Sequence, residues 1–530
     1  MRKMKRLFSI LLTMVIVFAM TTTVFAADET YDITINNKNA GHTYEAYQIF
    51  TGKLSGDILS DIEWGSSVTN KTLLAEASTI AAKLDSNYTG DDKLTVDGLL
   101  QLITLGDPTK TVSTQTGEAY VLADLVPGYY LIKDMNGSLD GDNDSYTEYI
   151  VKVVKDVTTS PKSDVPEVIK KVKDINDSTE TTLSDWQDSA DHDLNDAVPF
   201  LLKATLANNV EKYDSYKIIF HDTLSAGLTY NEDAKVYFNG NDVTAYFEIT
   251  EVNGQITVSC KNVKAFGASN SSIITVEYTA DLNENAVLGS KGNPNVVYLE
   301  YSNNPNWEVV FEKESIDTDG DGEPDKEIDV PKNPGNDGKD NDGDGKVDED
   351  DEKEEPTGNT PEDKVIVFTY KVVVNKVDKD QKALKGAGFT LYKKDKATGE
   401  YIAVGSELKG TDMTTFVWTH VDDGEYKIEE TTVPSGYNAV APIEFTITAE
   451  HEILSDDPQL TVLNNGELYT GEVFTGNPDT GIVDENIVNL KGTVLPETGG
   501  IGTTVFYVLG SILVLGAVVV MVAKKRMSER

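Results

Sequence analysis

The carboxyl-terminal end of the chain carries three segments whose order limits where the rest of the protein can fold. The pentapeptide Leu495-Pro496-Glu497-Thr498-Gly499 comes first. It is followed by an uncharged run of 21 residues, 503–523, which is long enough to cross a bilayer as a helix. The basic segment Lys524–Arg526 comes last and is expected to stay on the cytoplasmic side. We therefore predict a transmembrane helix over 503–523 and a folded part that lies outside the cell.

The amino-terminal end agrees with export. Basic residues within Met1–Arg6 precede an apolar stretch, Leu7–Met20, and small residues before Ala27 suit a signal peptidase. This pattern is typical of a secretory signal peptide, here over residues 1–26, which is removed from the mature chain.

The three carboxyl-terminal segments resemble the cell-wall sorting signal of Gram-positive surface proteins. In that family a sortase cuts between the threonine and the glycine, here Thr498 and Gly499, and joins the threonine carbonyl to an amine. The resemblance implies an LPXTG anchor, processing by sortase and attachment to peptidoglycan. A single-pass membrane protein with a chance pentapeptide is the alternative.

The composition excludes several classes of protein. Cys260 is the only cysteine, so this exported chain has to be stabilised by something other than an intrachain disulfide. The 89 acidic and 46 basic residues give a net charge of −43, which argues against nucleic acid as a partner because phosphate binding needs clustered Lys and Arg. No GxSxG, HExxH or GxGxxG motif is present. We therefore expect no enzyme and no required cofactor.

Short apolar runs predict three mostly β domains, with a small helical pattern around Ala77 and Ile80 in the first. The first domain spans 27–160, the second 161–310 and the third 365–491, and the last two are typical of β-sandwiches. The segment 311–364 is rich in Asp, Gly, Pro, Glu and Lys and is predicted to be an insert or linker without a core. The expected strands are 43–50, 119–133 with a break at Pro127-Gly128, and 149–157; then 168–172, 216–222, 235–238, 255–260, 273–280 and 296–301; then 365–377, 389–393, 415–421, 425–431 and 443–448.

Strand alternation places ionisable side chains on apolar faces in the second and third domains. A buried lysine or carboxylate costs free energy unless it is paired or neutralised. A sheet edge in water is the alternative location for any of these side chains. The residues are Lys170, Asp222 and Asn295 in the second domain, and Lys376, Glu430 and Asn489 in the third.

An internal Lys–Asn isopeptide bond is the chemistry that fits such a set. A desolvated lysine loses its proton and becomes a nucleophile. A buried carboxylic acid keeps its proton and polarises the asparagine carbonyl, so that the amine attacks and ammonia leaves. Proximity in the folded core supplies much of the rate. The covalent tie would replace the disulfide that this chain cannot make.

Two segments resemble known domains that form such bonds. Residues 371–490 resemble the collagen-adhesin B-type repeat, and residues 165–307 resemble the D2 isopeptide domain of backbone pilins. The resemblance implies Lys376 and Asn489 as linking residues with Glu430 as catalyst, and Lys170 and Asn295 with Asp222 as catalyst. Lys171 and Glu277 remain open as alternatives in the second domain. The matching motifs are Val374–Asp378, Leu384–Leu391, Tyr426–Thr431 and Pro434–Tyr437, and Pro166–Val172, His221–Leu228 and Gly292–Leu299.

The first domain resembles the amino-terminal domain of the same pilins at Ala46–Phe50 and Pro127–Leu131, although no linking triad can be assigned in it. Together the resemblances imply the major, or backbone, subunit of a sortase-assembled pilus, with tandem immunoglobulin-like sandwiches. That class needs an acceptor lysine between its first two domains. Val157–Lys162 stands at this boundary, so Lys162 is the expected acceptor, with an ordinary linker lysine as the alternative.

The acidic insert carries the spacing of a calcium-binding loop. Positions 1, 3, 5, 7, 9 and 12 of an EF-hand-type loop are occupied by Asp340, Asp342, Asp344, Lys346, Asp348 and Asp351, with Lys346 offering only its backbone carbonyl. A second loop starts at Asp317, Asp319 and Asp321 but has Ile328 at position 12. The first loop therefore favours calcium binding, with a solvated acidic linker as the alternative, and the second loop leaves both interpretations open.

Two functions follow from these observations. The first is a structural shaft subunit that sortase joins through Thr498 to Lys162 of the next identical subunit, with minor pilins and peptidoglycan as further partners. The second is a monomeric wall-anchored adhesin that binds a host surface ligand and makes no use of Lys162.

Overall fold

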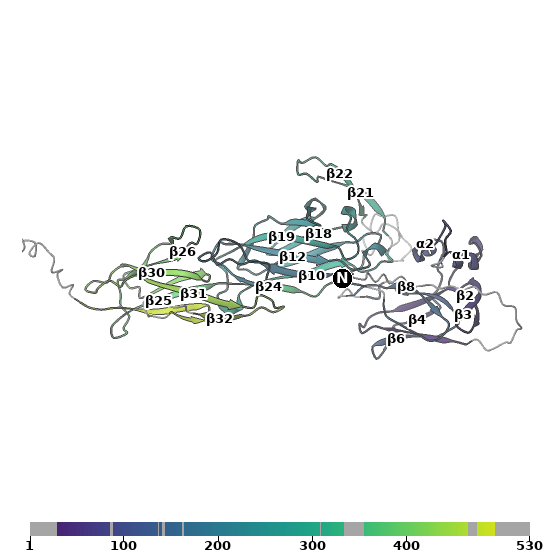
Figure 1. The fold of residues 1–530 in the computed structure, drawn as a ribbon, viewed down its shortest axis with the longest axis horizontal. Coiled ribbons are helices and arrows are strands. Elements are labelled where there is room, and N and C mark those ends of the chain that lie inside the picture. Colours follow the sequence, from purple (N-terminus) through teal and green to yellow (C-terminus); the bar gives the residue numbers. More distant parts are fainter. Residues whose placement is uncertain are drawn as a thin grey trace, which may run out of the picture.

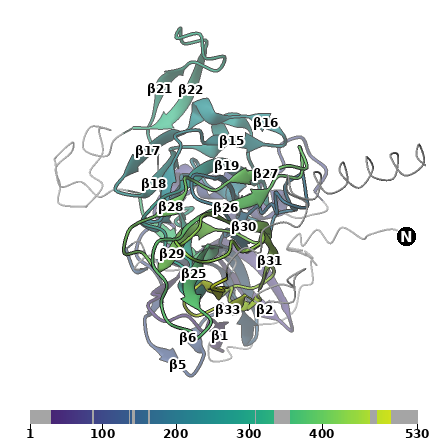
Figure 2. The ribbon, with the colours of Figure 1, turned by 90° about the vertical axis from the view of Figure 1, so that its left-hand side faces the viewer.

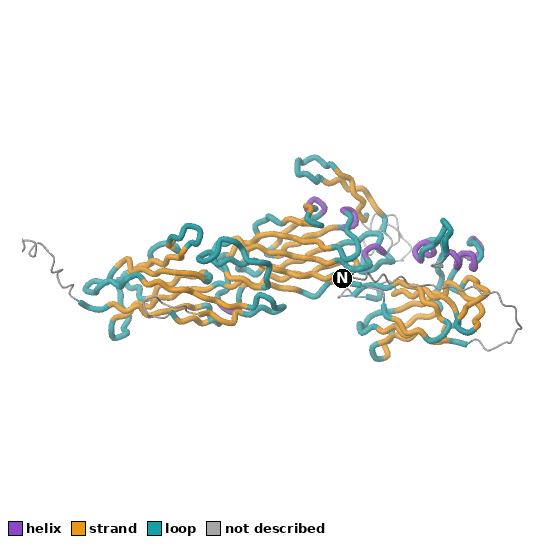
Figure 3. Tube along the Cα trace, viewed as in Figure 1, coloured by secondary structure: helices purple, strands orange, loops and turns teal. Residues whose placement is uncertain are grey.

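The computed structural model describes residues 29–84, 88–135, 137–139, 144–161, 164–307, 309–332, 355–464 and 474–492. They form three β domains that lie in a row (Figure 1). Strands are the main regular structure of each domain, and the helices are few and short (Figure 3). The prediction of an all-β chain of tandem sandwiches is confirmed, as is the helical insert in the first domain.

Several predicted segments lie outside the described residues. They are the signal peptide 1–26, Lys162, the acidic loop 340–351, the pentapeptide 495–499 and the span 503–523. In the described part of the chain, every helix is too short or too polar to cross a bilayer.

The first domain has two sheets that share an apolar core, with the helices on the outer side. Residues of β1, β6, β2 and β7 meet in this core, and the other face of β2 and β7 packs against Ala77, Ile80 and Leu99 of the helical insert. The helix begins at Ala77, so Leu73 precedes it and is 85% exposed. One sheet has the order β5 (Gln115–Thr116), β6 (Ala119–Leu125), β1 (Tyr31–Asn36), β9 (Val157–Thr159); the other has β3 (Ile58–Trp64), β2 (Tyr44–Ser55), β7 (Gly128–Asp134), β8 (Glu148–Val153), with β4 (Lys110–Val112) on β2; the helices are α1 (Ala77–Lys83) and α2 (Val96–Leu100).

The second domain is a sandwich of two larger sheets around one core. Its strand β12 was not predicted, and it contains Pro199, which is unusual in a central strand. Lys173, which follows β10, donates its N–H to the Pro199 carbonyl, and the Lys173 carbonyl accepts from His192 Nε2 at 2.9 Å, so the missing N–H of Pro199 leaves no acceptor unsatisfied on that side. The sheets are β10 (Glu167–Val172), β12 (Ala197–Thr205), β19 (Ile273–Leu282), β15 (Lys235–Phe238), β16 (Asn241–Asp242), with β14 (Leu228–Tyr230) on β19; and β11 (Ser189–Asp191), β24 (Asp363–Phe368), β20 (Asn293–Ser302), β13 (Ile218–Leu224), β18 (Gln255–Cys260), β17 (Glu248–Val252), with β23 (Thr357–Asn359) on β20.

The third domain is a smaller sandwich in which the first and last strands are neighbours. Strands β25 and β34 pair in parallel, with Lys371 opposite Ile482 and Asp378 opposite Asn489. The sheets are β29 (Thr415–Val421), β25 (Tyr370–Asp378), β34 (Ile482–Asn489), β33 (Thr475–Asn477); and β27 (Tyr401–Ala403), β26 (Gly388–Lys394), β30 (Gly424–Thr432), β31 (Ile443–His451), β32 (Leu460–Asn464), with β28 (Leu408–Lys409) on β26.

The boundary between these two domains differs from the prediction. The run 365–377 was expected to be one strand of the third domain, but it is divided at Thr369 into β24 and β25. Strand β24 pairs with β20 and, in parallel, with β11, so it completes a sheet of the second domain. The third domain therefore begins at Tyr370 rather than at residue 365.

The acidic insert also has more structure than was predicted. Strands β21 (Phe311–Ile316) and β22 (Lys326–Pro331) form an antiparallel hairpin that projects from the second domain (Figures 1 and 2). Ile316, Ile328 and Val330 bury a small cluster against Tyr246 and Ala265. Only three apolar residues build this cluster, so the Asp- and Gly-rich composition of the segment predicted no core.

Candidate functional site

The second domain brings its three predicted residues together between its sheets. Lys170 is on β10 of one sheet, while Asp222 on β13 and Asn295 on β20 come from the other. All three side chains point into the core because they occupy the same alternating positions as the apolar residues of their strands. Each residue is 0% exposed. The predicted set is therefore one buried centre.

Hydrogen bonds link the members of this centre through a tyrosine. Lys170 Nζ donates to Asp222 Oδ1 at 2.5 Å and to the Tyr278 hydroxyl at 3.2 Å. The Tyr278 hydroxyl donates to Asp222 Oδ2 at 2.5 Å and accepts from Asn295 Nδ2 at 2.7 Å. The carbonyl oxygen of Asn295 is buried and has no hydrogen-bond partner. The asparagine is thus held by its amide nitrogen with its carbonyl unsatisfied.

The environment makes Lys170 easier to deprotonate than an exposed lysine. Burial lowers the pKa of this lysine to about 8, and the neighbouring Asp222 only partly opposes the shift. Its ammonium lies over the rings of Phe200 and Tyr278, 5.4 and 5.5 Å from their centroids. Part of the population is therefore an uncharged amine near neutral pH, which is the nucleophilic form.

Tyr278 is the residue that sequence reasoning missed. It alternates with Ile274, Val276 and Ala280 along the buried face of β19, so the pattern itself placed a hydroxyl in the core. A buried tyrosine hydroxyl usually finds a polar partner, and that expectation is the signal that could have found it.

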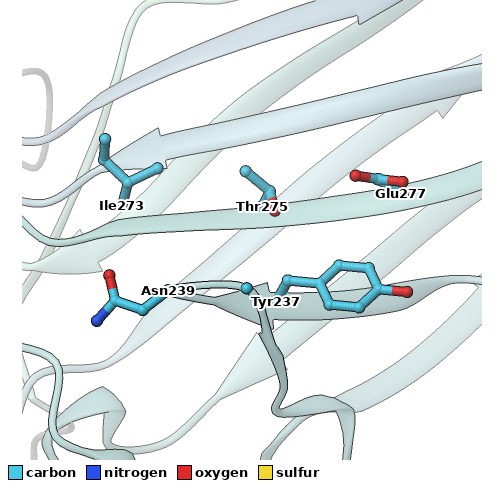
Figure 4. Close-up of a pocket in the computed structure, with 6 residues that line it drawn as sticks. Tyr237, Asn239, Ile273, Thr275 and Glu277 are labelled. Atoms are coloured by element: carbon cyan, nitrogen blue, oxygen red, sulfur yellow. The ribbon is translucent and has the colours of Figure 1, made fainter.

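The two alternatives in the second domain lie elsewhere. Lys171 points to the opposite side of β10 and forms an ion pair with Asp188. Glu277 is exposed on the outer face of β19, where it lines a shallow hollow of about 380 Å³ together with Thr275 and Tyr237 (Figure 4). Neighbouring residues of a strand face opposite sides, so both side chains point away from the core in which Asn295 lies.

The third domain builds a similar centre with a different layout. Lys376 and Asn489 lie on the paired strands β25 and β34 of one sheet, and Glu430 comes from β30 of the other. Lys376 is 0% and Asn489 is 1% exposed. The lysine and the asparagine are therefore neighbours within a sheet here, whereas in the second domain they face each other across the core.

Glu430 holds the asparagine of this centre. Asn489 Nδ2 donates to Glu430 Oε1 at 2.8 Å and to Oε2 at 3.1 Å, and the backbone N–H of Val440 donates to Oε2 at 3.0 Å. Lys376 Nζ donates to the Ile487 carbonyl at 2.7 Å. As in the second domain, the asparagine carbonyl oxygen is buried without a partner.

The first domain has a buried polar centre built around a histidine. Among its described residues no lysine is buried. His42 Nδ1 lies 2.7 Å from Asp134 Oδ1, and Nε2 lies 2.7 Å from Asp144 Oδ2. Burial by itself would lower the pKa of His42, but the two carboxylates overcome this and raise it to about 9. This centre is an ion-paired network rather than a site for amide formation.

His42→Gln is expected to remove a pH dependence from the first domain. The raised pKa means that the stabilisation from His42 is complete below pH 6.5 and is lost as the pH rises through about 9. The shift corresponds to about 3 kcal/mol at most. Calorimetry across this range should show the first-domain transition of the wild type falling more steeply than that of the variant. His221→Gln, in the second domain, is the control and should leave that transition unchanged; equal slopes in wild type and His42→Gln would contradict the assignment.

One of the two candidate calcium loops lies within the described residues. Carboxylate oxygens of Asp317, Asp319 and Asp321 lie within 4.8 Å of one another at the tip of the hairpin. Asp317 accepts backbone hydrogen bonds from Gly320 and Gly322, both at 2.7 Å. Ile328 is paired in β22 and buried, so it closes the loop as a strand residue.

Comparison with protein families gives two matches. Residues 370–457 match the SpaA prealbumin-like fold domain, and residues 488–529 match the LPXTG cell wall anchor motif. The first match covers most of the third domain, and the second covers the predicted sorting signal. The chain therefore carries a cell-wall anchor signal and is a surface protein anchored to the wall.

Comparison with individual proteins agrees with the fold. The chain is 23% identical over 389 residues to the trypsin-resistant surface T6 protein of Streptococcus pyogenes serotype M6, a match that covers 63% of this chain and 65% of the relative. The solved T6 backbone pilin of the same organism matches with a TM-score of 0.50 and 20% identity, over 89% of this chain and 100% of that one. The full-length major pilin SpaD of Corynebacterium diphtheriae has a TM-score of 0.44 and 16% identity, over 89% and 99%. The chain thus has the modular fold described for T6.

Proposed function

We propose that the chain is the structural shaft subunit of a covalently polymerised pilus on the cell surface. The observation that carries this proposal is the combination of a wall-anchor motif with the fold of the T6 backbone pilin. The two buried lysine centres agree with it, because a shaft without disulfides needs another source of covalent stability. In this function the chain is a substrate of sortase and not an enzyme that turns over a substrate.

Each buried centre is proposed to form one intramolecular isopeptide bond. In the second domain the neutral amine of Lys170 attacks Cγ of Asn295, and Asp222, whose Oδ1 lies 2.5 Å from the attacking nitrogen, takes up the proton that this nitrogen loses. The Cγ–Nδ2 bond then breaks, and a proton from the lysine nitrogen leaves with the amide nitrogen as ammonia. Tyr278 positions the leaving nitrogen, which it contacts at 2.7 Å. In the third domain Lys376 is the nucleophile and Asn489 the residue it attacks, while Glu430 is the catalyst and itself contacts the leaving nitrogen at 2.8 Å.

Polymerisation is proposed to use groups at two distant places on the subunit. Sortase would form an acyl-enzyme with Thr498, and Lys162 of the next subunit would supply the amine. Joining of unlike sites in this way does not close on itself and gives an open fibre. The last subunit would be transferred to peptidoglycan, and minor pilins would be joined by the same chemistry.

A denaturing gel of wall extract tests this proposal against the adhesin alternative. A covalent fibre gives a ladder of multimers that survives boiling in detergent, because the links between subunits are amide bonds. A wall-anchored adhesin that binds a host ligand as a monomer gives only the monomer and its peptidoglycan adducts. The second outcome would reject the shaft function.

Calcium binding by the acidic insert is a further part of the proposal. The loop 340–351 has aspartates at five EF-hand ligand positions. Asp340→Ala and Asp344→Ala should each weaken calcium binding, measured by isothermal titration, because each removes a carboxylate ligand. Asp337→Ala, just before the loop, is the control. Identical traces for wild type and both loop variants would support a solvated linker instead.

A further inference from the structure

The second and third domains meet at a polar junction that the proposed polymerisation does not use. Asp174 follows β10, and Ser189 and Asp191 belong to β11, all in the second domain. His451, the last residue of β31 in the third domain, reaches these residues. Its side chain is 7% exposed and that of Asp191 is 3% exposed. An imidazole of one domain is therefore enclosed by carboxylates of the other.

The hydrogen bonds of His451 determine which ring nitrogen carries a hydrogen. Nδ1 lies 2.7 Å from Ser189 Oγ, and the Ser189 hydroxyl donates its hydrogen to the Glu452 carbonyl at 2.8 Å. A hydroxyl has one hydrogen to donate, so Ser189 Oγ accepts a hydrogen bond from Nδ1–H. In the neutral ring the other nitrogen, Nε2, then has a free lone pair.

Nε2 faces two carboxylate oxygens at distances longer than hydrogen bonds. It lies 3.6 Å from Asp174 Oδ2 and 3.7 Å from Asp191 Oδ1, whereas N–H···O bonds are about 2.7–3.2 Å long. A lone pair directed at two anionic oxygens is unfavourable unless the ring takes up a second proton or a metal cation lies between the three atoms. Ligand atoms around a tetrahedral zinc ion are about 3.4 Å apart, since each bond is about 2.0–2.2 Å long. The spacing therefore suits a metal ion better than a shared proton.

A fourth polar group lies next to one of these carboxylates. Tyr370, the first residue of β25, is 0% exposed, and its hydroxyl has no hydrogen-bond partner of good geometry. It lies beside Asp191. A buried hydroxyl without a partner is costly, and a metal ion or a water bound to it would satisfy this group.

The backbone holds both carboxylates from behind. Asp191 Oδ2 accepts from the N–H of Asp423 at 3.1 Å, and Asp174 Oδ1 accepts from the N–H of Ile175 at 2.8 Å. In each case the other oxygen of the carboxylate is the one that faces His451. Supporting hydrogen bonds of this kind orient the ligands of metal sites.

We propose that Asp174, Asp191 and His451 bind a divalent transition ion of the zinc class across the junction, with the Tyr370 hydroxyl beside the remaining coordination position. Imidazole and carboxylate are ligands that zinc takes, and the two carboxylates balance the charge of the ion. Because the ligands come from two domains, the ion fixes the third domain against the second. This proposal goes beyond the shaft function and does not rest on it.

Zinc titration of the purified full chain tests the proposal. Bound metal is first removed with a chelator, and calcium is kept in excess so that it occupies sites made only of oxygen. The wild type should bind one zinc ion that is lost in His451→Gln. Ser189→Ala should weaken this binding about tenfold, because the ring loses its orienting partner. The matched control is His420→Gln, since His420 also reaches the second domain but contacts the Ala286 carbonyl, at 3.2 Å; it should bind as the wild type does.

A second ligand variant and a spectroscopic reading keep the outcome unambiguous. Asp174→Asn changes a side chain that is 19% exposed, so the fold should tolerate it, and it should weaken zinc binding as His451→Gln does. X-ray absorption at the zinc edge should show one imidazole nitrogen with oxygen ligands. Absence of zinc binding by the wild type, undiminished binding by His451→Gln, or an all-oxygen zinc shell would each overturn the proposal. The junction would then hold an imidazolium between two carboxylates.

Discussion

Glu430→Ala is expected to prevent the bond of the third domain, so that the chain keeps one more molecule of ammonia in its mass and the third domain is less stable. Intact-mass measurement of recombinant residues 27–494 should show two ammonia losses in the wild type, one for each buried centre, and a single loss in the variant. Without the bond, the unfolded third domain regains the freedom of a loop of more than a hundred residues. By the chain-entropy estimate this costs about 5 kcal/mol, which corresponds to a fall in Tm on the order of 15–20 °C.

The neighbouring acid provides the control. Glu429 is one residue away on β30, faces the other side of the strand and pairs with Lys427 at 2.8 Å. Glu429→Ala should keep both ammonia losses and nearly all of the stability. A wild-type mass equal to that of the unmodified sequence would exclude both bonds. Asp222→Ala tests the second domain in the same way. If the mass of this variant rises by one ammonia and the bond of the third domain is kept, the two centres act independently.

Lys162→Ala is expected to abolish the multimer ladder while leaving a wall-anchored monomer. The reason is that polymerisation needs the lysine amine as acceptor, whereas anchoring needs only the acyl donor Thr498. A gel of wall extract, probed with an antibody to the chain, measures both products at once. A Thr498→Ala variant should lose the ladder and the anchored monomer together, which separates the two roles.

Two other lysines near the same boundary serve as controls. Lys155 pairs with Asp57 at 2.9 Å, and Lys152 donates to the Asp57 carbonyl at 2.7 Å, so both amines are already held by the first domain. Lys155→Ala and Lys152→Ala should keep the ladder. If the ladder persists in Lys162→Ala and disappears in either of these, that lysine is the acceptor. Loss of the anchored monomer in Lys162→Ala would indicate a folding defect.

The buried centres could be located from sequence because they depend on the alternation of side chains along a strand. Lys170 and Lys376 each stand two residues from valines in strands with clear alternation, and parity decides which face a side chain takes. Tyr278 follows the same rule, but a tyrosine on an apolar strand face is also typical of an ordinary core residue. The distances within each centre could not be predicted, because they depend on which strands face or adjoin each other, and that is set by long-range pairing.

The parts of the fold that sequence reasoning missed have physical causes. Strand β12 contains Pro199, which a central strand tolerates here because His192 supplies the hydrogen bond to the Lys173 carbonyl that the proline cannot donate. The apolar run 365–377 looked like one strand, since nothing local reveals that Thr369 divides it between two domains. The sequence does not predict the junction around His451 either. Its residues come from distant parts of the chain, and each is an ordinary polar residue near the end of a strand.

The parallel pairing of β25 and β34 has a mechanical consequence. The chain enters the third domain at Tyr370 and leaves it after Asn489, at opposite ends of this strand pair, so tension along the fibre shears the two strands. With Lys376 tied to Asn489, tension passes through the side-chain bond after only a few residues of β25. The intervening segment, 377–488, would never be stretched, which withholds about 400 Å of chain per subunit at the full extension of a polypeptide. In a shaft built this way the third domain would transmit a pull with almost no lengthening.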